Sequence, residues 1–130
     1  MRFLRRGPLP WVGGLAAALV MAACSTPGGR VPAAESDLGD PQRGQTLISD
    51  YGCGSCHVVP GVHDAHGLVG PPLTQFGRRS YIAGVLPNNA DNLQHWIRDP
   101  QSVVPGNAMP YLGVTEVDAR DIAAYLLTIH

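Results

Sequence analysis

Five consecutive residues near the middle of the chain, Cys53 to His57, form the pattern C-x-x-C-H. This pattern is typical of the covalent attachment of a c-type haem. Two thiols three positions apart lie on nearly the same side of a helical turn, close enough to bond to both vinyl groups of one porphyrin. The histidine that follows is then placed to bind the iron. We therefore predict one haem c, attached through Cys53 and Cys56 and bound at its iron by His57.

Two other kinds of site use a cysteine pair with this spacing. A thioredoxin-like redox pair is expected beside alternating strands and helices, and no strand-rich run flanks Cys53. A structural zinc site needs two further ligands. These would have to be scattered histidines, because the only other cysteine is Cys24. Haem attachment is therefore the favoured interpretation.

A second axial ligand to the iron must come from elsewhere in the chain. Met109 is placed in a loop rich in proline and glycine, which would hold its thioether at a fixed distance from the iron. Two of the histidines follow the motif by only six and nine residues, so they would need a sharp detour to reach the opposite face. Methionine opposite histidine is an established pair of haem ligands. We predict Met109, with these other candidates: His63, His66, His95 and His130.

Residues 1–23 have the composition of an export signal. Three arginines precede an apolar, alanine-rich run that ends before Cys24. That run of fifteen residues is shorter than the about 20 that a membrane-spanning helix needs. The sequence around Cys24 resembles a bacterial lipoprotein box, which implies a lipid on Cys24 and an anchor at the outer face of the cell membrane. Ordinary cleavage beside Cys24, which would release the protein, is the alternative.

Residues 24–40 lack apolar periodicity and are predicted to form a flexible linker. Residues 41–130 then form a single small domain, whose marginal core a buried cofactor would complete. Strand patterns are hard to find in this domain, and its loops are long. We therefore predict an all-α fold whose helices and loops surround the haem.

Three helices are predicted from end signals and apolar spacing. The first begins at Asp40-Pro41 and leads into the haem motif. The second follows Asn88-Asn89 and ends before Pro100. The third opens at Thr115 with a start like a capping box.

The first and third helices carry apolar stripes that need partners. Gly44 would let the first helix approach the third closely, with Tyr125 or Leu126 facing the gap. Separate packing of the two stripes on the haem is the alternative that periodicity leaves open.

The domain carries these landmarks in order: Gly44, the C-x-x-C-H motif, Gly70-Pro71-Pro72-Leu73, Phe76-Gly77-Arg78, Trp96-Ile97-Arg98-Asp99-Pro100, Pro105-Gly106-Asn107-Ala108-Met109-Pro110 and Ala124-Tyr125-Leu126. With these landmarks, residues 41–130 resemble the class I cytochromes c. More narrowly, the stretch from Leu86-Pro87-Asn88 to Met109-Pro110 is similar to the cytochrome c domain that ends subunit II of some bacterial haem–copper oxidases. No second cluster of Cys, His and Met precedes the haem motif, as the copper-binding part of that subunit would need. A free-standing relative serving the same kind of partner is therefore expected.

The resemblance implies a small class I cytochrome c fold and further roles in binding the haem. The carbonyl of Pro71 should accept a hydrogen bond from Nδ1 of His57, which orients the ring. Arg78 should lie near the haem propionates, unless it is a solvated loop cation. Trp96 should line the pocket, either through a specific hydrogen bond or as plain core packing.

The chain contains no lysine, so it cannot dock through the ring of lysines that mitochondrial-type cytochromes c use. Removal of residues 1–23 leaves six arginines against ten acidic residues, a net charge of −4. An apolar contact around the haem edge, or co-localisation through the lipid, is therefore expected. A compositional bias toward arginine is the alternative explanation, and no nucleic-acid partner is expected.

These features together predict a single-haem electron carrier, not an enzyme, that delivers one electron to or within a membrane respiratory chain, toward a terminal oxidase. A fixed haem subunit of a membrane complex is the alternative within the same class. A peroxidase or a gas sensor would need an open iron site. His63 and Asp64 are the nearby pair that could serve a peroxidase.

Overall fold

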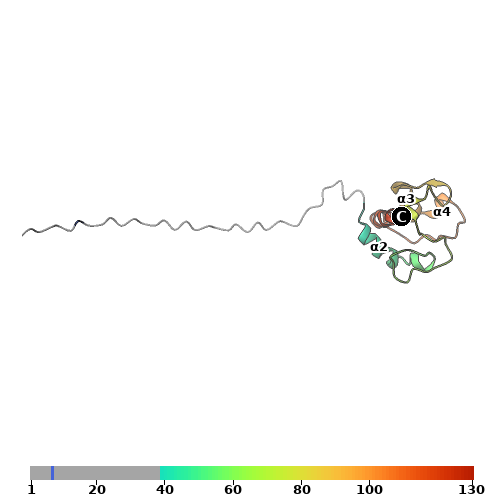
Figure 1. The fold of residues 1–130 in the computed structure, drawn as a ribbon. Coiled ribbons are helices and arrows are strands. Elements are labelled where there is room, and N and C mark those ends of the chain that lie inside the picture. Colours follow the sequence, from blue (N-terminus) through green and yellow to red (C-terminus); the bar gives the residue numbers. More distant parts are fainter. Residues whose placement is uncertain (1–6, 8–38) are drawn as a thin grey trace, which may run out of the picture.

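A computed structural model describes Gly7 and residues 39–130 of the chain. Apart from Gly7, the predicted export signal lies outside the described residues, as do Cys24 and nearly all of the predicted linker. No helix in the described part is long and apolar enough to cross a bilayer. Figure 1 shows how these residues fold. Their α-helices (α), 3₁₀ helices (η) and strands (β) follow in this order: α2 (Pro41–Asp50), η1 (Cys53–Ser55), η2 (Phe76–Arg78), β1 (Tyr81–Ile82), β2 (Leu86–Pro87), α3 (Ala90–Arg98), α4 (Pro100–Val103) and α5 (Glu116–Thr128).

The three predicted helices are confirmed as α2, α3 and α5, and each begins at its predicted cap. Asp40 accepts hydrogen bonds from the first backbone N–H groups of α2, and Pro41 is the first helical residue. Asn89 caps α3 and Thr115 caps α5 in the same way. Each cap satisfies donors that have no partner within the helix.

Two features of the fold, a β-hairpin and a one-turn helix, differ from the prediction. β1 and β2 form an antiparallel hairpin in which Tyr81 pairs with Pro87, and two residues per strand are too few for an alternating pattern to show. α4 is a single turn that Asp99 caps and Pro100 begins. The domain is therefore mainly helical with a small hairpin, rather than strictly all-α.

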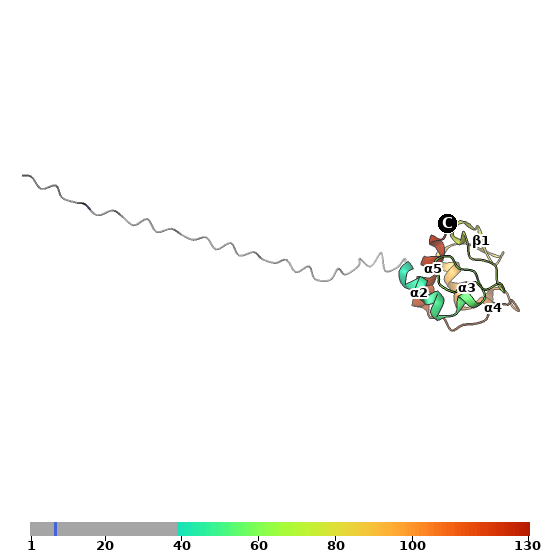
Figure 2. The same cartoon turned by 60° about the horizontal axis from the view of Figure 1, so that its bottom comes forward.

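Helices α2 and α5 lie against each other in both views of the fold (Figures 1 and 2), and α3 packs on α5 as well. The close approach predicted at Gly44 is confirmed, because a Cβ there would lie 2.0 Å from the carbonyl oxygen of Asp121. The predicted partners, Tyr125 or Leu126, are wrong by one helical turn. Tyr125 turns instead toward the loop after the haem motif, where its hydroxyl donates to Pro60 O at 2.6 Å.

A polar cluster joins the two helices beside this crossing. The guanidinium of Arg43 on α2 donates to the carboxylates of both Asp118 and Asp121 on α5. Asp118 also accepts from the hydroxyls of Tyr51, at 2.7 Å, and Thr115, at 2.8 Å. These hydrogen bonds, first of all the one from Tyr51, hold the pKa of Asp118 below its usual range.

Candidate functional site

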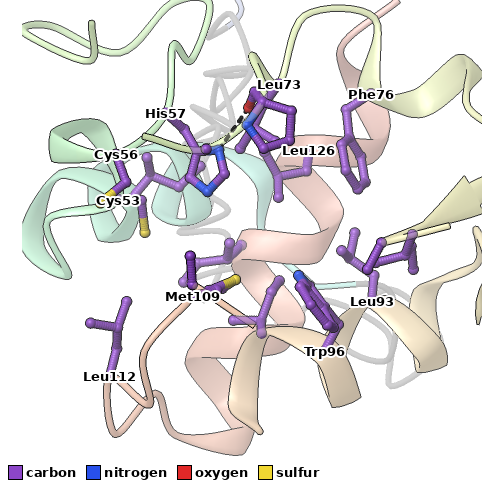
Figure 3. Close-up of a pocket in the computed structure, with 18 of the residues that line it drawn as sticks. Cys53, Cys56, His57, Leu73, Phe76, Leu93, Trp96, Met109, Leu112 and Leu126 are labelled. Carbon is purple, nitrogen blue, oxygen red and sulfur yellow. Dashed lines mark hydrogen bonds between the residues drawn. The ribbon is translucent and has the colours of Figure 1, made fainter. Parts of the chain in front are cut away.

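A cavity of about 350 Å³ lies between the C-x-x-C-H segment, helices α3 and α5, and the loop that follows α4. Its size is in the range of pockets that hold small organic molecules. The inner wall consists of aliphatic and aromatic side chains, and Figure 3 shows several of them converging on the open space. Those from the buried core are Ile48, Phe76, Ile82, Leu93, Ile97, Val114, Ile122 and Leu126.

The C-x-x-C-H segment forms one side of the cavity. Gly52 adopts a left-handed conformation with φ of 70° and ends the run of α2. The chain then turns through η1, where the N–H of His57 donates to the carbonyl of Cys53 at 3.0 Å. Cys53, Cys56 and His57 all line the cavity, and the two cysteines lie together at one side of it (Figure 3). Burial raises the pKa of the Cys53 thiol.

The His57 ring is held from behind by the loop at Gly70 and Pro71. Its Nδ1 lies 2.7 Å from the carbonyl oxygen of Pro71, so the contact that the resemblance implied is present. A carbonyl can only accept, so Nδ1 carries the proton and Nε2 keeps a lone pair for a ligand. A Cβ on Gly70 would lie 2.2 Å from Cε1 of His57. Glycine is therefore required for the loop to pass this close to the ring.

Met109 comes from the opposite side of the cavity. Figure 3 shows its side chain and the His57 ring facing each other across the open space. The four histidines considered as alternatives do not line the cavity. His63 is almost fully exposed and pairs with Asp64 at 2.9 Å, and Nε2 of His95 lies 3.1 Å from Ser102 Oγ.

Trp96 and an arginine complete the lining. Trp96 enters the cavity from α3, as expected (Figure 3). Arg78 is exposed and lies outside the lining, whereas Arg79, the next residue, is part of it. The Arg79 guanidinium lies 5.2 Å from the centre of the Phe76 ring and donates to Thr74 O at 3.1 Å. Arg78 is the last residue of η2 and Arg79 is the extended residue after it, a difference that the sequence motif does not show.

The sequence model of the cytochrome c family matches residues 41–130, the same residues that build the cavity. This chain belongs to the cytochrome c family. Three relatives are each described as cytochrome c oxidase subunit 2. The protein from Alkalihalophilus pseudofirmus is 43% identical over 88 residues, which cover 67% of this chain and 25% of that protein.

The other two relatives agree with the first. The protein from Bacillus subtilis is 39% identical over 92 residues, covering 66% of this chain and 25% of the relative. The one from Bacillus sp. (strain PS3) is 38% identical over 86 residues, covering 63% of this chain and 24% of the relative. This cytochrome c thus spans about a quarter of the length of the curated relatives it matches.

Membership of the family implies a covalently bound haem c, and the residues around the cavity fit that group. Two thiols, an imidazole and a thioether open onto one apolar space, which is the donor set that a covalent haem uses. Within residues 39–130, no three His, Cys, Asp or Glu side chains are grouped as a metal-ion site. The zinc alternative therefore has no set of ligands in the described part.

Proposed function

We propose that this cytochrome c is a single-haem electron carrier that passes one electron to or within a membrane respiratory chain, toward a terminal oxidase. The supporting observation is that His57 and Met109 face each other across an apolar cavity, beside two cysteines. When bound, haem c supplies an iron that changes between the ferrous and ferric states. Cys53 and Cys56 would attach the group, and His57 and Met109 would be its axial ligands.

The protein residues serve this role by holding the ligands still and keeping water away. The carbonyl of Pro71 fixes the orientation of His57 and raises the basicity of its free nitrogen. The apolar wall of the cavity, to which Trp96 contributes, excludes solvent. A methionine ligand favours a relatively high reduction potential. These properties suit delivery of an electron to an oxidase.

The partner that we propose is a haem–copper oxidase, because the three relatives are oxidase subunits. Val69, Tyr81 and Leu112 line the cavity and are also exposed by 72%, 59% and 37%. We call these three residues the apolar rim. An apolar rim on a lysine-free chain fits an uncharged, apolar patch on the oxidase. Because the matched domain is joined to oxidase subunits in the relatives, a fixed haem subunit is the alternative.

Electron transfer, rather than catalysis by this chain alone, is the activity that we propose. A peroxidase needs acid–base groups beside an open iron position. The pair His63 and Asp64 is exposed and does not contribute to the cavity. The cavity position opposite His57 is instead lined by Met109.

We further propose that residues 1–23 are an export signal, that residues 24–40 are a linker, and that a lipid on Cys24 holds the haem domain near the outer face of the cell membrane. Two acyl chains suffice for stable attachment, whereas one chain binds only marginally. Mass spectrometry of the N-terminal peptide of the purified protein tests this directly. An unmodified peptide beginning near Ala23 or Ser25 would contradict the anchor.

The proposed function requires a covalently attached haem, and this attachment can be tested directly. Two thioether bonds should keep haem on the denatured wild-type protein in acidified organic solvent, and Cys53→Ala should weaken or abolish that retention. Ser55→Ala is the matched control, because it changes the same turn and leaves both thiols in place. Clean loss of haem from the wild-type protein would refute the assignment.

A further inference from the structure

The backbone of Met109 lies outside the helices and strands and is held by two side-chain amides. Its N–H donates to Oδ1 of Asn107 at 2.8 Å, and its carbonyl oxygen accepts from Nε2 of Gln101 at 2.9 Å. Both backbone hydrogen-bonding groups of Met109 are therefore satisfied by side chains. Such bonds replace the ladder that a regular element would supply.

Gln101 uses its whole amide group on this loop. From its place on α4, Nε2 also donates to the carbonyl of Asn107 at 3.0 Å, and Oε1 accepts from the N–H of Gly106 at 3.0 Å. Gly106 has φ of 79°, so the loop turns there through a conformation that favours glycine. One side chain thus binds the loop at three points, Gly106, Asn107 and Met109.

Asn107 ties the same loop to both ends of α4. Its Nδ2 donates to the carbonyls of Pro100, at 2.9 Å, and Val104, at 2.7 Å. α4 is itself anchored, because Pro100 is fully buried and Asp99 caps the helix. The position of the Met109 backbone is therefore set by a short helix that packs beside α3.

We propose that Gln101 and Asn107 are positioning residues that hold the Met109 thioether at the place where the iron is bound. The inference rests on the proposed function of Met109 as an axial ligand. Methionine has three rotatable side-chain bonds, so a mobile backbone beneath it would lower the effective concentration of its sulfur at the iron. A held backbone keeps external ligands from competing.

Gln101 provides the sharper test of the two residues because it does not line the cavity. A change at Gln101 can reach the iron only through the loop. Gln101→Glu has nearly the same shape and still accepts from Gly106, but it cannot donate to the carbonyls of Asn107 and Met109. Gln101→Ala removes all three bonds.

The matched control is Ser102→Ala, the next residue on α4. Its hydroxyl donates to the carbonyl of Asp99 at 2.8 Å and contacts His95, and it makes no bond to the Met109 loop. This variant removes a side-chain hydrogen bond within the same short helix while leaving the loop bonds in place. It separates a general loss of stability from a loss of positioning.

The experiment titrates imidazole into the ferric, haem-loaded full chain and follows the sulfur-to-iron charge-transfer band. Losing two or more hydrogen bonds should make imidazole bind about tenfold more tightly to Gln101→Ala and Gln101→Glu than to the wild type. Ser102→Ala should match the wild type. Asn107→Asp, which keeps Oδ1 for Met109 and loses the Nδ2 donors, serves if the Gln101 variants fail to fold.

Three results would overturn the proposal. Equal imidazole affinity in the wild type and the folded Gln101 variants would refute the positioning role but not Met109 ligation. If the Gln101 variants do not fold, an unchanged imidazole affinity in Asn107→Asp would refute it in the same way. An equal gain of affinity in Ser102→Ala would show that α4 stability, and not the amide bonds, governs the loop. A wild-type ferric protein without the charge-transfer band would refute Met109 ligation, and with it both this inference and that part of the proposed function.

Discussion

At the scale of single residues, the two predicted iron ligands are oriented by different means. His57 is fixed by one main-chain carbonyl, that of Pro71, at 2.7 Å. Met109 is fixed through its own backbone, by the amides of Gln101 and Asn107. The imidazole is rigid, so one hydrogen bond suffices for it. The thioether chain is flexible and offers no strong hydrogen-bonding atom, so its backbone must be held instead.

Removal of the thioether should open one side of the site. We expect Met109→Ala to let added carbon monoxide bind the ferrous protein, which the wild type should resist because a strong ligand occupies that position. His63→Ala and His66→Ala are the controls, since both side chains lie outside the cavity. The absorption spectrum under carbon monoxide measures the result. Binding of carbon monoxide to the wild type, or to His63→Ala or His66→Ala with Met109 intact, would contradict the assignment of Met109 as an iron ligand.

At the scale of elements, the contact between α2 and α5 combines a close backbone approach with a partly buried charge cluster. Gly44 allows the approach, and Arg43 bridges two carboxylates of α5 beside it. Tyr51, which donates to Asp118, stands at the end of α2, two residues before Cys53. The cluster therefore supports the start of the haem motif as well as the helix pair.

Acid should weaken this helix pair through Asp118. Its pKa is lowered in the folded state, so the carboxylate adds stability above its unfolded pKa and loses that contribution as the pH falls below about 4. We expect Asp118→Asn to be less stable than the wild type at pH 7, by about 1 to 3 kcal/mol, and to show a smaller further loss on acidification. Urea unfolding at a series of pH values measures both.

Asp50→Asn is the control for that experiment. Asp50 is exposed at the end of α2, and the described part of the structure records no hydrogen bond to its side chain. Its pH profile should follow that of the wild type. A profile for Asp118→Asn that coincides with the wild-type profile would show that the cluster does not couple folding to protonation.

At the scale of the whole molecule, the distribution of charge and of exposed apolar side chains bears on docking. The chain has no lysine, and its net charge is −1 with the export signal included. The residues of the apolar rim both line the cavity and are exposed, so a partner that contacts them would lie beside the proposed haem site. Long-range attraction is screened by salt, whereas an apolar contact is not.

Electron transfer to a purified oxidase should therefore change little as the ionic strength rises. Val69→Glu places a charge on the rim and should slow the transfer by roughly tenfold, the effect of about 1.4 kcal/mol at the contact. Val117→Glu, at an exposed position on α5 outside the cavity lining, is the matched control and should act like the wild type. Stopped-flow oxidation of the ferrous protein gives the rates.

A steep loss of rate with salt would contradict apolar docking. It would indicate a positive patch formed by arginines of the domain, namely Arg43, Arg78, Arg79, Arg98 and Arg120. Equal rates for Val69→Glu and the wild type would show that the partner binds elsewhere on the surface.

The sequence by itself determined the parts of this protein whose chemistry is local. The C-x-x-C-H motif predicts haem attachment from sequence because the two cysteines and the iron-binding histidine are close together in the chain. The starts of α2, α3 and α5 could be predicted because a cap and its helix are neighbours in the chain. Met109 could be singled out because prolines and glycine surround it in the sequence.

Tertiary structure alone decided which distant groups meet. Gly44 meets the backbone at Asp121 rather than Tyr125, because the crossing point depends on the position of α5 along the axis of α2. Arg79 rather than Arg78 lines the cavity, because the chain leaves the 3₁₀ turn η2 after Arg78 and Arg79 is extended, a change of backbone direction that follows from packing. The bonds from Gln101 to the Met109 loop arise between residues whose separation follows no repeat. Such contacts depend on the three-dimensional path of the loop, which no local pattern encodes.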